Sequence, residues 1–351
     1  MTVAHNIYFH VPFCKSKCRY CAFFSQACAN PDWDEYTRKI VDEIEYWAEK
    51  LGNISVPTVF FGGGTPSLIP IKNFEHIIKK LNNRFSLAAN AEITLEANPG
   101  TIDNNKLKDF ISLGINRLSV GIQSLDDQKL KFLGRTHNVD CALRTIEYAN
   151  KMNIRVSGDF IYGLPGENID DIIKTCSKIN KLGLTHCSMY ELTIEEGTPL
   201  ANSNPIMPDN DTMANMYLAI QNTLSLPRYE VSNYATPGNE CQHNKNIWDG
   251  QPYIGIGMGA AGRIFHNNTW YEQRGNYAEF KPISNKERAI EKIITGLRTT
   301  QGVCLTDDVK NAINMNKVQQ MNNLLSLKEN RLCVTEAGIL VLDDMVVKIV
   351  R

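Results

Sequence analysis

Six short runs rich in β-forming residues recur over the first part of the chain, with helical patterns between them. They are residues 7–11, 58–61, 92–97, 117–122, 155–162 and 186–192. Successive runs end 25 to 50 residues apart, which is the spacing of βα units in a parallel sheet. Between the first two runs, apolar side chains are spaced for one face of a helix that ends at Gly52: Tyr36, Ile40, Ile44, Trp47 and Leu51. The pattern predicts an α/β fold, either a doubly wound sheet or a partial barrel.

The residues at the ends of these runs favour the barrel. Polar residues or glycines lie near the ends of almost all runs: Cys14, Gly62, Glu96, Gln123, Asp159 and Glu191. In a parallel barrel the carboxyl ends of all strands converge on one site, where such residues can act together. We therefore expect a partial (β/α)6 TIM-like barrel over residues 1–200, with the functional site at this end.

The later parts of the chain have a different character. Residues 201–280 show no clear periodicity, so we expect an irregular elaboration beside the barrel. From residue 281 a helical pattern returns, followed by a short apolar strand at 331–334 and a last helix. The first of these helices would pack through one face: Ile290, Ile293, Ile294 and Leu297. Residues 281–351 are expected to form a small helical, winged-helix-like module.

The charge balance excludes some partners. There are 37 Lys and Arg against 38 Asp and Glu, a net charge of −1, whereas extensive nucleic-acid binding shows as a strongly basic balance. No run approaches the roughly 18 apolar residues that span a bilayer, and the N-terminus lacks the pattern of a secretory signal. We expect no nucleic-acid partner, no transmembrane segment and a cytoplasmic location, where thiols stay reduced.

Three of the ten cysteines fall within eight residues. Cys14, Cys18 and Cys21 form a C-x3-C-x2-C motif on the loop after the first predicted strand. Thiolates are soft ligands, and three of them can hold an iron–sulfur cluster. Three ligands for a four-iron cluster leave one iron open, which is the condition that distinguishes catalytic from structural metal sites. The spacing therefore favours a [4Fe–4S] cluster with an open iron.

Other interpretations of these cysteines remain open at this point. A Cys3His zinc site could use His10 or His5, and buried thiols can also group by chance. The basic residues Lys15, Lys17 and Arg19 surround the cysteines and would favour the deprotonated thiols, although a solvated basic loop would look the same.

The cysteine motif also carries a family resemblance. The segment YFHVPFCKSKCRYCAF closely resembles the signature of the radical S-adenosylmethionine (SAM) superfamily. Further segments follow in family order: FFGGGTPSLI, LEANPG, GINRLSVGIQS, LGRTH and DFIYGLPGE. Within the superfamily the chain looks like the branch of oxygen-independent coproporphyrinogen III oxidases and the related haem chaperones. The resemblance implies a [4Fe–4S] cluster on the three cysteines, SAM on the open iron, and an electron donor for the cluster.

The resemblance also implies which residues contact SAM. The glycine loop meets the SAM amino group, an aromatic residue precedes the third cysteine, and polar strand ends reach the ribose and carboxylate. Taken alone, a glycine triplet is more often a tight βα connection. The positions that match the family are Tyr8, Tyr20, Gly63, Gly64, Thr65, Glu96, Gln123, Arg135 and Asp159.

Two departures weaken the resemblance to the oxidases. Their signature has a further cysteine two residues after the third, where this chain has Phe23, and Cys28 is too far along to replace it. The oxidases also carry an N-terminal arm that helps to build the substrate site, and only seven residues precede Tyr8 here. Both departures predict that coproporphyrinogen oxidase activity is absent.

The haem-chaperone relatives share a further segment with this chain. YEVSNYATPG is followed by a motif His-Asn-x-x-Tyr-Trp, present here at residues 243–248 with Ile247 in place of the tyrosine. The resemblance makes His243 a candidate ligand for haem iron, with Cys241 as a nearby competitor. It implies a chaperone that binds haem and delivers it to acceptor proteins, with residues 201–280 as the region that handles haem or substrate. The alternatives are the oxidase itself, and a zinc-stabilised binding module that needs only the three cysteines.

Overall fold

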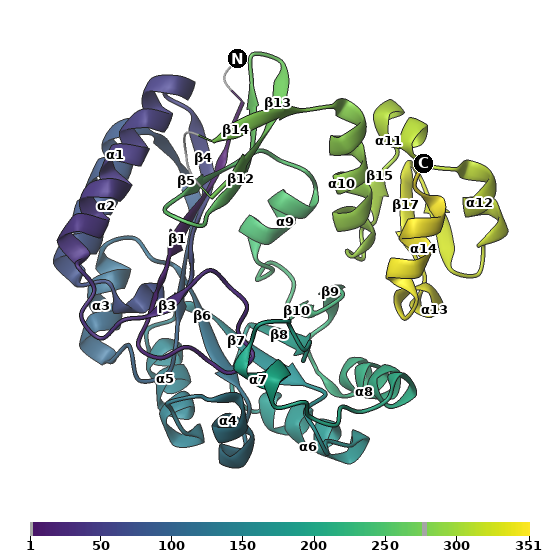
Figure 1. Ribbon diagram of the computed structural model, residues 1–351, viewed down its shortest axis with the longest axis horizontal. Helices are drawn as coiled ribbons and strands as arrows, with labels where there is room; N and C mark the ends of the chain where they lie inside the picture. The colour runs from purple at the N-terminus through teal and green to yellow at the C-terminus, as the bar shows by residue number, and fades with distance from the viewer. Residues whose placement is uncertain (1–2, 276–278) are drawn as a thin grey trace.

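Six parallel strands form the inner wall of the fold (Figure 1). The computed structural model describes residues 3–275 and 279–351. In chain order the strands are β1 (Asn6–Val11), β4 (Ser55–Gly63), β5 (Ser86–Ala97), β6 (Arg117–Gln123), β7 (Arg155–Tyr162) and β8 (His186–Glu191). Each pairs in parallel with the next along the chain. The predicted partial (β/α)6 barrel is confirmed, since a doubly wound sheet would reverse its strand order at a switch point.

Helices cover the outer face of this wall (Figure 1). The first, α1 (Trp33–Leu51), begins at Asp32, whose side chain accepts the backbone N–H of Glu35, and ends at Gly52 with a positive φ of 73°. Its predicted apolar face is buried against the sheet. The remaining crossover helices are α2 (Ile71–Arg84), α3 (Asn104–Ser112), α4 (Asp127–Leu133), α5 (Val139–Lys151) and α6 (Ile169–Ile179).

The sheet continues beyond the barrel on both sides. Next to β1 lies β11 (Tyr253–Ile256), which is parallel to it, followed by the antiparallel strands β12 (Ala261–His266), β13 (Thr269–Arg274) and β14 (Phe280–Ile283). Next to β8 lie the antiparallel β10 (Asn233–Ala235) and β9 (Arg228–Glu230). The region expected to be irregular thus adds six strands to the barrel sheet. Its strands are only three to six residues long, which is too short for a periodic signal.

A short helix, α9 (Gln242–Trp248), lies inside the curve of the sheet (Figure 1). It packs against β1 and β4, near the ends where those strands begin. The same region contains α7 (Pro199–Asn202) and α8 (Asn210–Thr223), and α8 packs against α6. Helix α9 therefore closes the end of the barrel that lies opposite the cysteine loop.

The C-terminal part has a hydrophobic core of its own. It contains α10 (Asn285–Leu297), β15 (Val303–Cys304), α11 (Asp307–Ala312), α12 (Met315–Gln320), β16 (Leu325–Lys328), β17 (Arg331–Val334), α13 (Glu336–Ile339) and α14 (Leu342–Ile349). Ile293 and Leu297 are buried in this core as expected. The expectation for Ile294 was wrong: it is 45% exposed, because it falls just outside the packed stripe of α10. No helix in the described part of the chain is long and apolar enough to cross a membrane.

Candidate functional site: two adjoining cavities in the barrel

Two cavities lie side by side inside the barrel. The first, here called the cysteine cavity, measures about 380 Å³ and lies at the carboxyl ends of the strands. The second, here called the barrel cavity, measures about 460 Å³ and extends towards α9. Both volumes fall in the range of small-molecule sites. The cavities share five lining residues: Phe23, Glu96, Ser119, Asp159 and Tyr190.

The three clustered cysteines line the cysteine cavity together. Cys14 ends the short strand β2 (Phe13–Cys14), which pairs with β3 (Gln26–Ala27), so both ends of the cysteine loop are anchored. The Cys21 backbone N–H donates to the Cys18 carbonyl at 3.3 Å. Burial raises the pKa of the Cys21 thiol, and the neighbouring Cys18 and Cys14 raise it further. The three thiols are therefore close enough to influence one another electrostatically.

Arg135 supplies the cation at these thiols. Its Nη1 donates to Cys18 Sγ at 3.1 Å, and its Nη2 donates to Asn98 Oδ1 and to the Gly121 carbonyl. Of the loop's own basic residues, Lys17 lines the cavity but its Nζ donates to the carbonyls of Phe23 and Ser25, Arg19 lies over the Phe132 ring, and Lys15 is exposed. The cation that donates to a thiol is therefore Arg135, which is distant in sequence, rather than one of the three basic residues of the loop.

The histidines that a zinc site would need are already engaged. His10 uses Nδ1 with the Tyr8 hydroxyl at 3.0 Å and Nε2 with the Phe24 carbonyl at 2.7 Å. His5 lies where β1 begins, and its ring nitrogens contact the backbone of Val3 and Phe265. Neither imidazole is free to complete a Cys3His site, which removes the main support for the zinc interpretation.

The chemistry of the donor set fits an iron–sulfur cluster. All ten cysteines are free thiols. Within residues 3–275 and 279–351, no three His, Cys, Asp or Glu side chains are arranged to hold one metal ion. A cluster makes a different demand, because thiolates distribute over several iron atoms rather than converging on one. Three soft thiols on one cavity wall, with a guanidinium donating to one of them, match that demand.

Eight of the nine predicted SAM positions line the cysteine cavity, and Tyr8 does not. Tyr8 lines the barrel cavity, where it stacks on Phe60. At two of these positions the packing of the fold itself requires glycine. Gly63 has a φ of 106° and a Cβ there would meet the His10 ring, while a Cβ on Gly64 would press on the Phe13 carbonyl at 2.6 Å. The eight positions that the structure brings together are Tyr20, Gly63, Gly64, Thr65, Glu96, Gln123, Arg135 and Asp159.

Glu96 is a buried carboxyl on the wall between the two cavities. Its Oε2 accepts the Gly63 backbone N–H at 3.2 Å. Burial, reinforced by the nearby Asp159, raises the pKa of Glu96 to about 8. Asp159 itself accepts hydrogen bonds from Ser119 and Ser157. At neutral pH the Glu96 carboxyl is therefore mostly protonated until a cation approaches it.

This pKa predicts a pH dependence of SAM binding. SAM carries a positive sulfonium, so a Glu96 that pairs with SAM must lose its proton on binding. The affinity should rise with pH up to about 8, by at most roughly tenfold per pH unit, and level off above that value. Calorimetric titration of wild type and Glu96→Gln between pH 6 and 9 checks this. Equal pH slopes in both proteins would contradict the role of Glu96.

His243, a lining residue of the barrel cavity, carries a buried imidazole nitrogen without a hydrogen-bond partner among the described residues. This side chain is buried, stacks on Phe60 and lines the cavity. Thr58 donates its only hydroxyl hydrogen to Asn6 Oδ1 at 2.8 Å, so its oxygen must accept from His243 Nδ1 at 2.7 Å. The proton therefore sits on Nδ1, and the buried Nε2 has no hydrogen-bond partner among the described residues. A neutral imidazole with a free lone pair is the form that binds a metal.

His186, another of the three histidines that line this cavity, is in a different state. Ser157 donates to Asp159 Oδ1, so it accepts from His186 Nδ1 at 2.8 Å. His186 Nε2 lies 2.7 Å from the hydroxyl of Tyr229, which completes its hydrogen bonding. Burial lowers the pKa of His186 and that of His243, to about 3 for His243. Both are neutral, but only His243 of the two offers a free nitrogen.

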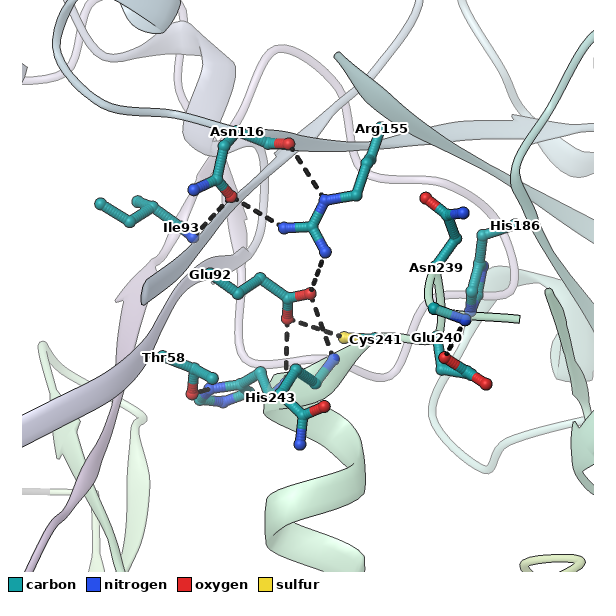
Figure 2. A network of polar contacts seen from close by, with 12 residues as sticks. Thr58, Glu92, Ile93, Asn116, Arg155, His186, Asn239, Glu240, Cys241 and His243 are labelled. Carbon is teal, nitrogen blue, oxygen red and sulfur yellow. Dashed lines mark hydrogen bonds and ion pairs between the residues drawn. The ribbon is translucent and has the colours of Figure 1, made fainter. Parts of the chain in front are cut away.

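Glu92 fixes the helix that carries His243 (Figure 2). Its carboxylate accepts the backbone N–H groups of Gln242 and His243 at 3.1 and 2.9 Å and pairs with Arg155 Nη1 at 3.2 Å. It thereby caps α9. The N-cap residue of this helix, Cys241, makes no side-chain hydrogen bond that would cap it. The Cys241 thiol points at the same carboxylate, with Sγ 3.7 Å from Oε1. A single carboxylate on β5 thus orients the candidate ligand.

We expect Glu92→Gln to destabilise the protein by about 2–4 kcal/mol, because an amide nitrogen would face the donors that the carboxylate now accepts. The measurement is urea denaturation followed by circular dichroism. Glu240→Gln is the matched control: Glu240 lies beside the same helix, and its partly exposed contact with Lys245 at 4.0 Å should contribute less than about 1 kcal/mol. Equal losses in the two variants would show that Glu92 does not anchor α9.

Comparison with known proteins agrees with this geometry. Residues 8–179 match the radical SAM superfamily. The "Heme chaperone HemW" of Escherichia coli is 36% identical over 264 residues, covering 74% of this chain and 70% of that protein. The protein of the same name from Mycobacterium tuberculosis is 32% identical over 364 residues, covering 97% of this chain and 93% of its own. These relatives span both the barrel and the later segments.

The fold has a close counterpart among solved structures. Coproporphyrinogen III oxidase from Escherichia coli, described as a radical SAM enzyme, superposes with a TM-score of 0.82 over 99% of this chain and 90% of its own. The two sequences are only 17% identical, so the likeness concerns the fold alone. The superposition covers the strands added at both sides of the barrel as well as the C-terminal module.

Proposed function

Since this chain belongs to the radical SAM superfamily, and within it to the family of the proteins named heme chaperone HemW, we propose that it binds haem and delivers it to acceptor proteins. The superfamily implies a [4Fe–4S] cluster and SAM, whose shared chemistry is one-electron cleavage of SAM. On this proposal the cysteine cavity takes the cluster and SAM, and the barrel cavity takes haem.

The observation that carries this proposal is the free Nε2 of His243. Haem iron is held by an axial imidazole nitrogen in many proteins, and the Thr58 hydrogen bond leaves that nitrogen without its proton. Cys241 is a poor competitor, because burial raises the pKa of its thiol to about 12 and Glu92 accepts its hydrogen. Cys241 also does not line the barrel cavity. The proposal therefore assigns the iron to His243.

The residues of the cysteine cavity fit the cluster and SAM in complementary ways. Cys14, Cys18 and Cys21 would each hold one iron, and Arg135 would stabilise the Cys18 thiolate. Glu96 would pair with SAM on the wall between the cavities. Within the family resemblance, Phe23 stands where the oxidases have a further cysteine, and its exposed ring lines both cavities. This substitution favours haem handling over porphyrinogen oxidation.

The proposal extends to partners and location. We infer a reductant protein for the cluster and one or more haem-accepting proteins, and a cytoplasmic location in which the thiols stay reduced.

The proposed function is tested with anaerobically reconstituted protein. Wild type should bind haem and transfer it to an apo-haem protein, with the transfer followed by absorption spectroscopy. With SAM and a reductant supplied, it should not decarboxylate coproporphyrinogen III. Porphyrinogen turnover at enzymatic rates would establish the oxidase instead, while an inactive protein that also fails to bind haem would contradict both functions.

A further inference from the structure

Arg117 is a buried cation without a hydrogen-bond or ion-pair partner among the described residues. It opens β6, is only 2% exposed and lines the barrel cavity. Within the described residues its guanidinium makes no hydrogen bond and no ion pair, although it carries five N–H donors and stays charged at any accessible pH. The other arginine that is nearly as buried, Arg288, pairs with Glu291 at 2.7 Å. An uncompensated buried charge is strongly unfavourable.

The acidic groups near Arg117 are already committed to other donors. Glu92 is saturated by Arg155 and by the two backbone N–H groups of α9. Asp159 accepts from Ser119 and Ser157. These carboxylates offset the charge of Arg117 from a distance, but neither lies within 4 Å of its guanidinium. The N–H donors that face the cavity are left for a molecule that enters it.

Arg117 and His243 act on the same space. Both line the barrel cavity, and after burial the charge of Arg117 is the cause that lowers the pKa of His243. The cavity wall therefore combines an imidazole whose Nε2 has no hydrogen-bond partner among the described residues with a planar cation within electrostatic range of it. A ligand that satisfies both carries a metal ion and an acidic group. Guanidinium binds a carboxylate through two parallel hydrogen bonds.

We propose that Arg117 is the binding site for a carboxylate of the ligand in the barrel cavity, namely a propionate of haem. The inference rests on the proposed function and deepens it, because it sets the orientation of the porphyrin: the iron at His243 and one propionate at Arg117. It also gives a role to a buried guanidinium that makes no hydrogen bond within the described residues.

The test compares two probes, haem and haem dimethyl ester, whose propionates are blocked. Wild type should bind haem roughly tenfold to a hundredfold more tightly than the ester, as expected for hydrogen bonds to a charged group. Arg117→Met should bind the two probes equally, and Arg117→Lys should keep part of the preference. Arg144→Met, at an exposed arginine, is the matched control and should keep all of it. Binding is followed by fluorescence quenching and absorption spectra.

The possible outcomes separate the proposals. An Arg117→Met protein that still prefers haem over its ester would overturn this inference while leaving haem binding intact. A variant that loses affinity for SAM instead would show that Arg117 holds the SAM carboxylate, which also overturns it. Wild type that binds neither probe would overturn the proposed function itself. Because Arg117→Met removes an unpaired buried charge, we expect the variant to fold, and thermal denaturation checks this.

Discussion

Replacing any one of Cys14, Cys18 and Cys21 with serine should abolish the iron–sulfur cluster. A serine hydroxyl is a hard ligand and is not deprotonated at neutral pH, so it cannot replace a thiolate on iron. The three positions should behave alike because all three thiols line one cavity and no fourth cysteine lines it with them. The iron and sulfide content would be measured after anaerobic reconstitution. The charge-transfer absorption of the cluster at visible wavelengths would be recorded on the same samples.

The controls are cysteines elsewhere in the fold. Cys141 lies on α5 and Cys304 on β15, away from the cysteine cavity, so Cys141→Ser and Cys304→Ser should keep the full iron content. A Cys14/Cys18/Cys21 triple variant that retains wild-type iron and sulfide would remove the basis for the cluster, and with it the assignment of the neighbouring residues to SAM.

His243→Ala should cause the second large effect, because it would remove the proposed ligand of haem iron. We expect the absorption spectrum of bound haem to shift to that of a five- or six-coordinate species with another ligand, and the affinity to fall by roughly a hundredfold or more, as for loss of a metal ligand. Thr58→Val should produce a smaller version of the same change. It removes the hydroxyl that accepts from Nδ1, so the tautomer is no longer fixed.

Two variants distinguish ligation from a general disturbance of the cavity. Cys241→Ser should keep the haem spectrum, because that thiol donates to Glu92 and does not line the cavity. His186→Gln should also keep it, since both ring nitrogens of His186 are already hydrogen-bonded. If Cys241→Ser changes the spectrum and His243→Ala does not, the iron ligand is the thiolate and the assignment made here is wrong.

The parts of the fold that the sequence predicted are those with strong periodicity. All six barrel strands and α1 were predicted, because each buries a continuous or regularly spaced apolar surface. The strands β9 to β14 were missed. They are short, and β11 is placed by its pairing with β1 rather than by its own sequence. Pairing between segments distant in sequence leaves no local pattern to detect.

The residues of the candidate site also fall into two groups, those that the sequence could predict and those that it could not. Residues in short motifs could be assigned in advance, as the cysteines and Glu96 were. Glu92, Arg117 and the contact of Arg135 with Cys18 could not, because a charged residue in a sequence is ordinarily a solvated one. The sequence did contain one indication of these two residues. Glu92 and Arg117 lie in barrel strands, at positions where the two-residue alternation of side chains directs them to the inside of the barrel.

The position of β1 bears on how the chain folds during synthesis. Ile7 pairs with Val59 of β4 on one side and with Ile254 of β11 on the other. Since translation adds roughly 5–20 residues per second, β1 and the cysteine loop that follows it wait on the order of tens of seconds for their second neighbour. During that interval one edge of β1 is open to wrong pairing, a hazard that chaperones and slow cluster loading would both influence. A nascent chain that ends before β11 is therefore an incomplete barrel with an exposed edge. Although β1 is synthesised first, it is the last barrel strand to have both of its neighbours in place.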